Sequence, residues 1–251
     1  MSRRFVLMLV VLSLFLSSCT TSPLTLMQQA LADRLARELK QALGLSVRHV
    51  IAQLAEPGGY LDNPLVRLLV PPQVTLAVKL LQGVGMLFDE EAGDPRQRLE
   101  KAMNQAVSAA IPTAAPILGQ ALEDLPLSEA RALLTAGRTA FTDYLKEKTA
   151  DALMEQLQPA VTANLGQLGA LGQYQELVEG LRALQLVAPE MPEELPAVPE
   201  EPLAPAEEFE RLVTEQAVTG LFRMVGAEEE KIRRSPLFQD IELLKKALGQ
   251  Q

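Results

Sequence analysis

The sequence predicts an all-α protein, an irregular multi-helix bundle that forms a single domain with one Pro/Glu-rich surface loop. Apolar residues recur every three or four positions along most of the chain, as on the buried face of a helix. No segment shows the apolar–polar alternation and β-branched or aromatic enrichment of a strand. The chain has 251 residues, of which 48% are hydrophobic, ten are Phe or Tyr, and none is Trp. We therefore expect a mostly aliphatic core.

Proline, glycine and capping residues divide this pattern into helices. Ser22-Pro23 indicates the start of a helix whose leucines recur every four residues and which Gly44 would end. A second helix is expected from Ser46 to the turn at Pro57-Gly58-Gly59, followed by a loop over 60–71. Further helices are expected at about 72–88, 94–110, 112–122, 128–137, 139–157 (broken by Pro159), 160–170, 173–187, around 213–225, and 236–248.

Residues 188–206 differ in composition from the rest of the chain. Six of these 19 residues are proline and five are glutamate. Proline denies helical hydrogen bonds, and like charges favour extension, so we expect a solvated loop or linker. The piece that follows has only about 45 residues, which is small for a separate core. We therefore favour one domain over two.

The N-terminus resembles a bacterial lipoprotein signal. Arg3 and Arg4 precede an apolar run of about 12 residues, too short for a membrane span of roughly 20. Leu16-Ser17-Ser18-Cys19 resembles a lipobox, in which a peptidase cuts before a cysteine that carries diacylglycerol. We expect a signal peptide over 1–18, an acylated tether over 19–25 and a helical domain over 26–249. The alternative is an uncleaved anchor or a buried N-terminal helix.

The charge limits the partners. Removing residues 1–18 removes two basic and no acidic residues, which leaves 21 basic against 32 acidic, or −11. Nucleic acid and anionic lipid headgroups would both repel such a chain. Membrane attachment is therefore expected from acyl chains on Cys19. Thr20, rather than Asp, follows the cysteine, which favours a lipid-anchored, periplasm-facing protein of the bacterial outer membrane.

The residues offer little support for catalysis. His49 is the only histidine and lies off the apolar face of its helix, so we expect it to be solvated. No G-x-S-x-G motif accompanies it, and an acylated Cys19 cannot bind zinc. Gly166, Gly169 and Gly172 match neither a phosphate loop nor a dinucleotide fingerprint. We expect no enzyme activity, no cofactor and no metal, while a hydrolase is the least favoured alternative.

Two sets of residues are candidate binding sites. The first is a stripe of threonines on one helix face, beside an apolar tyrosine, that together would line a ligand groove: Thr135, Thr139, Thr142 and Thr149, with Tyr144. The alternative is that each threonine bonds the carbonyl one turn back, with Gly137 breaking the register. The second is a turn-rich loop that would grip a ligand: Gly58, Gly59, Tyr60, Asp62 and Asn63. A plain helix–helix connection is the favoured alternative there.

Glutamates near the C-terminus form a third cluster. Glu229 with Arg233, and Glu230 with Arg234, are spaced for i,i+4 pairs on a helix. Such pairs are worth about 0.2–0.5 kcal/mol each. A carboxylate site for a metal or for catalysis is disfavoured, because the adjacent cations would compete.

Four separated motifs resemble one known family. They are Gly58 to Pro64; Asn104 before Ala114-Ala115-Pro116-Ile117; Thr139 to Leu145 with Lys148-Thr149; and Ala217 to Phe222, Glu228 to Arg233 and Leu243 to Lys246. Over residues 26–249 the chain resembles a bacterial lipoprotein family known as domain of unknown function 4197. Where that family usually has a tyrosine, Leu212 precedes Val213-Thr214. The resemblance implies a helical exported lipoprotein and supplies no reaction.

The function expected from the sequence is a non-enzymatic binding or accessory role in the bacterial envelope. The partner would be another envelope component, either protein or lipid. The alternative is a carrier or sensor of an apolar ligand, such as a lipid, held between helices. A continuous apolar cavity above about 300 Å³ would favour the carrier.

Overall fold

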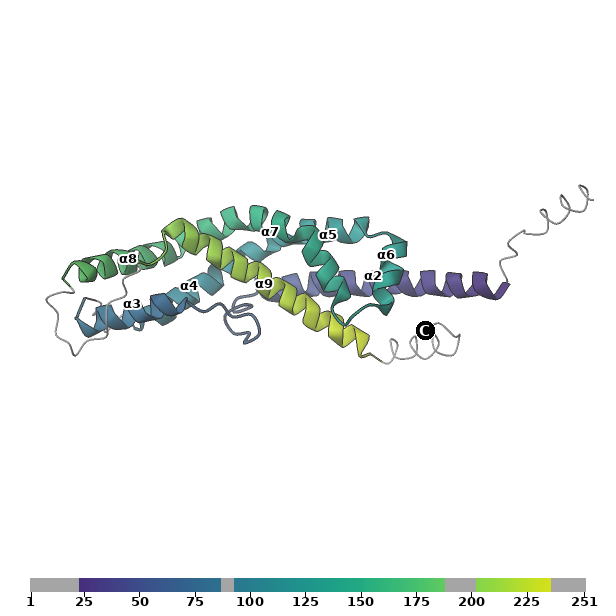
Figure 1. Cartoon of the computed structure of the whole chain (residues 1–251), viewed down its shortest axis with the longest axis horizontal. Coiled ribbons are helices and arrows are strands. Elements are labelled where there is room, and N and C mark those ends of the chain that lie inside the picture. The colour runs from purple at the N-terminus through teal and green to yellow at the C-terminus, as the bar shows by residue number, and fades with distance from the viewer. Residues whose placement is uncertain (1–22, 87–92, 188–201, 236–251) are drawn as a thin grey trace, which may run out of the picture.

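Helices make up the regular structure of the described part of the chain (Figure 1). The structure is a computed structural model that describes residues 23–86, 93–187 and 202–235. The elements are α2 (Pro23–Ala55), α3 (Pro72–Gly83), α4 (Pro95–Ala110), the 3₁₀ turn η1 (Ile111–Thr113), α5 (Ala114–Asp124), α6 (Leu127–Thr135), α7 (Ala140–Gln167), α8 (Ala170–Val187) and α9 (Ala206–Arg233). No strand occurs in the described ranges, and the predicted all-α class is confirmed.

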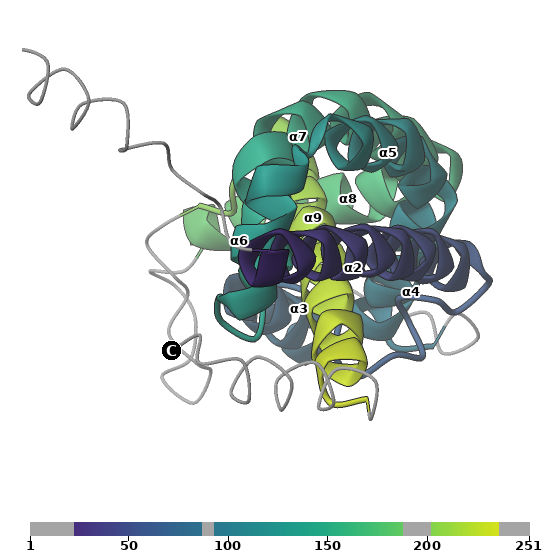
Figure 2. The same ribbon diagram turned by 90° about the vertical axis from the view of Figure 1, so that its right-hand side faces the viewer.

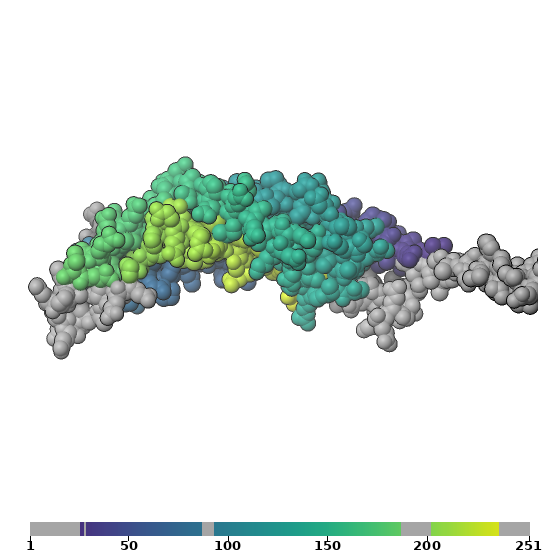
Figure 3. Space-filling model, turned by 45° about the horizontal axis from the view of Figure 1, so that its top comes forward, coloured from purple at the N-terminus to yellow at the C-terminus, as the bar shows by residue number. Residues whose placement is uncertain are grey.

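The helices build an elongated, bowed body (Figures 1 and 3). The first turns of α2 project beyond α6 at one end, and α3 packs on α8 at the other. Between these ends, α7 packs along α9 and also contacts α4 and α5. Seen end-on, α2 crosses α9 (Figure 2).

The core is mainly leucine, valine and alanine, as predicted. Its largest fully buried side chains are four aromatic ones: Tyr60, Phe141, Tyr174 and Phe209. None of the helices in the described ranges combines the length and the apolarity that crossing a bilayer requires.

α2 is one helix where the sequence predicted two. Gly44 lies inside it and does not end it. Buried residues continue on one face across the glycine, and Leu43 and Val47 on either side are at most 2% exposed. A glycine inside a helix costs about 1 kcal/mol. Burying each leucine or valine returns roughly 1.5–3 kcal/mol, so packing outweighs the local preference.

Pro159 likewise lies inside α7 and does not break it. An interior proline removes a helical hydrogen bond and costs roughly 3 kcal/mol. The buried stripe nevertheless continues on both sides of it: Leu153, Leu157, Val161 and Leu165. α7 therefore absorbs most of the separate helix predicted over 160–170, and α8 begins after Gly169, whose φ is +72°.

Several helix boundaries agree with the sequence. The Asp94 carboxylate accepts a hydrogen bond from the N–H of Arg96 at 3.0 Å, and Pro95 is the first residue of α4. That helix ends at Ala110, as predicted. Gly137 lies in the connection between α6 and α7. The helix predicted over 112–122 is divided between η1 and α5.

Other predicted boundaries shift or fall outside the described ranges. α3 ends at Gly83 rather than near Phe88, because Gly85, with φ +76°, donates to the carbonyl of Gln82 and closes the helix. Of the predicted 188–206 loop, residues 202–205 are non-helical and Ala206 begins α9. The signal peptide, Cys19, residues 188–201 and the helix predicted over 236–248 lie outside the described residues.

Candidate functional site

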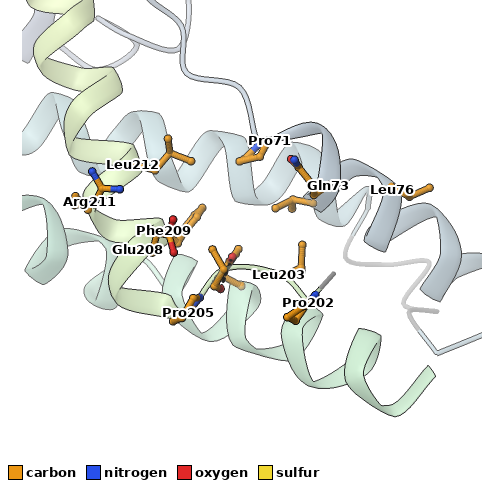
Figure 4. A pocket seen from close by; sticks show the side chains of 13 residues that line it. Pro71, Gln73, Leu76, Pro202, Leu203, Pro205, Glu208, Phe209, Arg211 and Leu212 are labelled. Atoms are coloured by element: carbon orange, nitrogen blue, oxygen red, sulfur yellow. Dashed lines mark hydrogen bonds between the residues drawn. The ribbon is translucent and has the colours of Figure 1, made fainter. Parts of the chain in front are cut away.

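A cleft of about 710 Å³ lies where α3, α8, α9 and residues 202–205 meet (Figure 4). It is at the end of the body opposite the start of α2 (Figure 1). The lining is mostly apolar: Pro71, Gln73, Val74, Leu76, Tyr174, Pro202, Leu203, Ala204, Pro205, Glu208, Phe209, Arg211 and Leu212. Its volume is above the lower bound of about 300 Å³ for a ligand site, but the cleft is open at the surface rather than enclosed.

A stacked aromatic pair forms part of the lining of the cleft. The rings of Tyr174 and Phe209 stack with centroids 4.0 Å apart and planes within 8°. The Tyr174 hydroxyl donates to the carbonyl of Ala204 at 2.8 Å, which fixes the non-helical residues 202–205. Burial, with a contribution from the charge of Glu208, raises the pKa of Tyr174 to about 12. The hydroxyl therefore remains a donor at neutral pH.

Prolines position the two walls. Pro71 precedes α3 with ψ 149°, and Pro72 is the first helical residue. Pro205 precedes α9 with ψ 157°. Proline fixes φ and lacks the N–H that a helix interior requires, so it stands at or just before the start of a helix. The helices α3 and α9, which form the two walls, therefore begin at defined residues. Glu208 lies in the first turn of α9, where a negative charge complements the helix dipole.

The rim is more polar than the floor. Gln73, Glu208 and Arg211 are exposed, whereas Val74 and Leu203 are buried. Arg211 forms an ion pair with Glu215, one turn further along α9. A molecule with an apolar body and a polar or charged end would match this distribution.

The loop that the sequence suggested as a gripping loop is bonded into the core. Gly58 has φ +84°, and a Cβ at Gly59 would lie 2.4 Å from the carbonyl oxygen of Leu54, so both positions require glycine. Tyr60 is fully buried, and its hydroxyl donates to the carbonyl of Ala217 at 2.8 Å. Burial raises the pKa of Tyr60 well above its ordinary range.

The polar residues of the same loop divide between two roles. Asn63 accepts from the N–H of Leu65 at 3.1 Å and closes a turn. Asp62 is exposed and lines a second hollow, apart from the cleft. The loop is thus a structural connection for most of its length, with Asp62 at an open surface.

The comparison with protein-family models decides the family. A model described as "Protein of unknown function (DUF4197)" matches residues 30–249. The chain belongs to this family. Comparisons with curated proteins and with solved structures found no match.

One motif residue that pointed to the DUF4197 family is a buried clamp. The Asn104 side chain accepts from the N–H of Leu68 at 2.9 Å and donates to the carbonyl of Leu68 at 2.9 Å. It also donates to the carbonyl of Glu100 at 2.7 Å. Asn104 therefore bonds both backbone groups of Leu68, within the non-helical chain that leads to Pro71 and the cleft.

The threonine stripe is split by the DUF4197 fold. Thr135 ends α6 and Thr139 precedes α7, so they do not share one helix face. Thr142 donates to the Glu229 carboxylate at 2.8 Å, and Thr149 donates to the carbonyl of Leu145 at 2.7 Å. Tyr144 is half-buried. These residues do not line the cleft, and the groove they would form stays a prediction.

One of the two predicted i,i+4 ion pairs is buried. The predicted i,i+4 partners are in contact, and Glu229 lies 2.8 Å from Arg233, but Glu229 is 0% exposed. Its carboxylate accepts from the backbone N–H groups of Phe141 and Thr142 at 3.1 and 2.8 Å, and so caps α7. Arg233 in turn donates to the carbonyl of Leu133, near the end of α6.

His49 is exposed on α2. No three His, Cys, Asp or Glu side chains within the described ranges are grouped to hold a metal ion.

Sequence reasoning missed the cleft and the burial of Glu229. The cleft assembles residues from three separate stretches, around 71–76, 174 and 202–212. The only local sequence signals among these residues are Pro71-Pro72 and Pro205. They predict where helices start, but not that the two helix starts lie close together in the fold. Glu229 carries no signal, since Glu228 and Glu230 flank it with the same side chain.

Proposed function

We propose that this protein is a bacterial envelope lipoprotein, held to the membrane by acyl chains on Cys19, that binds an apolar ligand in the cleft at its other end. The observation that carries the proposal is the apolar cleft of about 710 Å³ between α3, α8 and α9. This volume falls in the range of roughly 300–1,000 Å³ typical of small-ligand sites.

The course of α2 supports the anchored arrangement. α2 begins only four residues after Cys19 and has 33 residues, so it is about 50 Å long at 1.5 Å per residue. No charged residue occurs from Cys19 to Ala32, and Leu26 and Met27 are exposed. An uncharged, partly apolar start suits the surface of a bilayer, whereas the acidic remainder of the chain would stay in water. The cleft would then face away from the membrane.

The lining supports a ligand with an apolar body and a polar end, such as a fatty acid or a lipid acyl chain. Pro71, Pro202 and Leu212 present apolar surface, and Arg211 at the rim offers a cation to a carboxylate or phosphate. Burying apolar surface contributes roughly 25 cal/mol per Å², so an acyl chain held in the cleft would gain affinity from burial alone.

Binding is tested with the soluble Cys19→Ser protein and a fluorescent fatty acid. Leu212→Asp places a charge in the cleft and is expected to weaken binding at least about tenfold, because that charge must be desolvated. Leu186→Asp is the matched control, since Leu186 is 79% exposed near the end of α8 and does not line the cleft. Equal affinity of both variants and the parent would exclude the cleft as the site.

The anchor is tested separately by cell fractionation. The native chain is expected with membranes and the Cys19→Ser chain in the soluble fraction. Cys19→Ser protein that remains with membranes would refute lipid anchoring without affecting the cleft.

A second candidate function is the binding of a partner protein of the envelope. Two leucines in the non-helical segment before α3 favour it, because Leu65 and Leu69 are 47% and 57% exposed while the alternate residues Val66 and Leu68 are buried. Affinity capture from solubilised envelopes with the native chain and with a Leu65→Ser, Leu69→Ser double variant tests it. A partner retained equally by both would count against this surface.

A further inference from the structure

A second hollow, of about 470 Å³, lies at the start of α4 and shares no lining residue with the cleft. Four cationic side chains line it: Arg67, Arg96, Arg98 and Lys101. The other lining residues are Leu61, Asp62, Gly93, Asp94 and Gln97. In a chain with a formal charge of −9, this group of cations around one concave surface is a local reversal of charge.

A buried carboxylate holds two of the arginines in place. Glu100 is 1% exposed, and its two oxygens accept from Arg67 at 3.2 Å and from Arg96 at 2.9 Å. These charge-assisted bonds fix the orientation of both guanidinium groups. Because each guanidinium carries five N–H donors, bonding to Glu100 leaves further donors directed elsewhere.

The other two cations are not engaged. Within the described ranges, the side chains of Arg98 and Lys101 form neither an ion pair nor a hydrogen bond, and both are exposed. They are three residues apart on α4 and therefore share a face. Among the described residues that line the hollow, two are carboxylates: Asp94 caps α4 and contacts Arg96, and Asp62 is exposed at the open side.

We propose that this hollow binds a phosphate group. Arginine presents a planar fork of donors that matches phosphate oxygens, and lysine adds a mobile point charge. Two oriented arginines beside two unengaged cations provide both elements, and the first turn of α4 adds the positive end of a helix dipole. The phosphate would belong either to a small soluble molecule or to a lipid headgroup, since the same groups recognise both.

The experiment uses the Cys19→Ser protein with inorganic phosphate as the soluble probe. The second probe is a phosphatidylcholine vesicle with or without phosphatidylglycerol. Binding is measured by calorimetry for phosphate and by co-sedimentation for vesicles, at low ionic strength because screening weakens exposed charge interactions. The test variant is Arg98→Ala with Lys101→Ala. The control, Arg34→Ala with Arg37→Ala, removes the same charge from the exposed surface of α2.

The expected result is a dissociation constant at least about tenfold higher for the test variant and within about twofold for the control. Saturable phosphate binding that the test variant loses supports a soluble phosphorylated ligand. Binding only to phosphatidylglycerol vesicles, lost in the same variant, supports a lipid headgroup. Absence of binding to both probes, or equal loss in the test and control variants, overturns the proposal. Circular dichroism checks that both variants remain folded, as expected for exposed side chains.

Discussion

Replacing Glu229 is the sharpest test of the packing described above. Its carboxylate accepts from two backbone N–H groups of α7, from the Thr142 hydroxyl and from Arg233. Arg233 is itself largely buried, with an 11% exposed side chain. Removing one member of a buried ion pair typically costs about 3–5 kcal/mol, because the other charge loses its compensation. Glu229→Ala is therefore expected to lower the free energy of unfolding by about 3–5 kcal/mol.

The neighbouring glutamate provides the matched control. Glu230 pairs with Arg234 at the same i,i+4 spacing, but the Arg234 side chain is 68% exposed. An exposed pair contributes about 0–1 kcal/mol, so Glu230→Ala should change stability by less than about 1 kcal/mol. Glu229→Gln keeps the size of the side chain and should still cost about 2–3 kcal/mol, which separates lost charge from a cavity.

Urea denaturation followed by circular dichroism measures both effects. For a domain of this length, 3–5 kcal/mol corresponds to a melting temperature lower by roughly 6–20 °C. A Glu229→Ala protein as stable as Glu230→Ala would refute the assignment of Glu229 as a buried cap of α7.

Three further outcomes are expected. Gly220→Ala should destabilise the protein by roughly 1–3 kcal/mol, because the new Cβ would lie 3.0 Å from the Tyr60 ring. Gly119→Ala meets open space within a helix and should stabilise the protein by roughly 0.5–1 kcal/mol. Denaturation of both variants checks this, and equal effects would contradict it. The three tyrosines have raised pKa values, so their stabilising contribution is complete below pH 10 and is lost as the pH rises further. On titration to high pH, tyrosinate absorbance should appear together with loss of helical dichroism. Full ionisation of a folded protein would argue against their burial. In the lipidated protein bound to vesicles, spin-labelled lipids should quench the indole fluorescence of Met27→Trp but not that of Leu186→Trp. If neither indole is quenched in vesicle-bound protein, the start of α2 lies in water.

Local signals predicted where helices begin better than where they continue. Asp94 and the prolines at the starts of α2, α3 and α4 act within one turn, so they can be read from neighbouring residues. Gly44 and Pro159 were read as helix ends, but the buried stripes on either side extend the helices through them. Such burial depends on distant elements, and local propensity does not contain it.

The candidate site was beyond sequence reasoning for the same reason. The cleft and the second hollow are formed by residues far apart in the chain, and Arg67 reaches Glu100 only because the loop folds back onto α4. The loop from Gly58 to Asn63 was recognised as unusual. Its glycines and Tyr60 are required for packing, while Leu61 and Asp62 line an open hollow.

The last described helix, α9, has a consequence for how the chain folds. It supplies the carbonyl that bonds Tyr60, the Phe209 ring that stacks on Tyr174, and the carboxylate that caps α7. Each contact joins α9 to residues made much earlier, and such long-range contacts form late. The amino-terminal helices therefore cannot complete their packing until residue 229 has been synthesised. The nascent chain therefore stays incompletely packed through most of its synthesis. A truncation before α9 should yield a loosely packed, protease-sensitive product rather than a smaller stable domain.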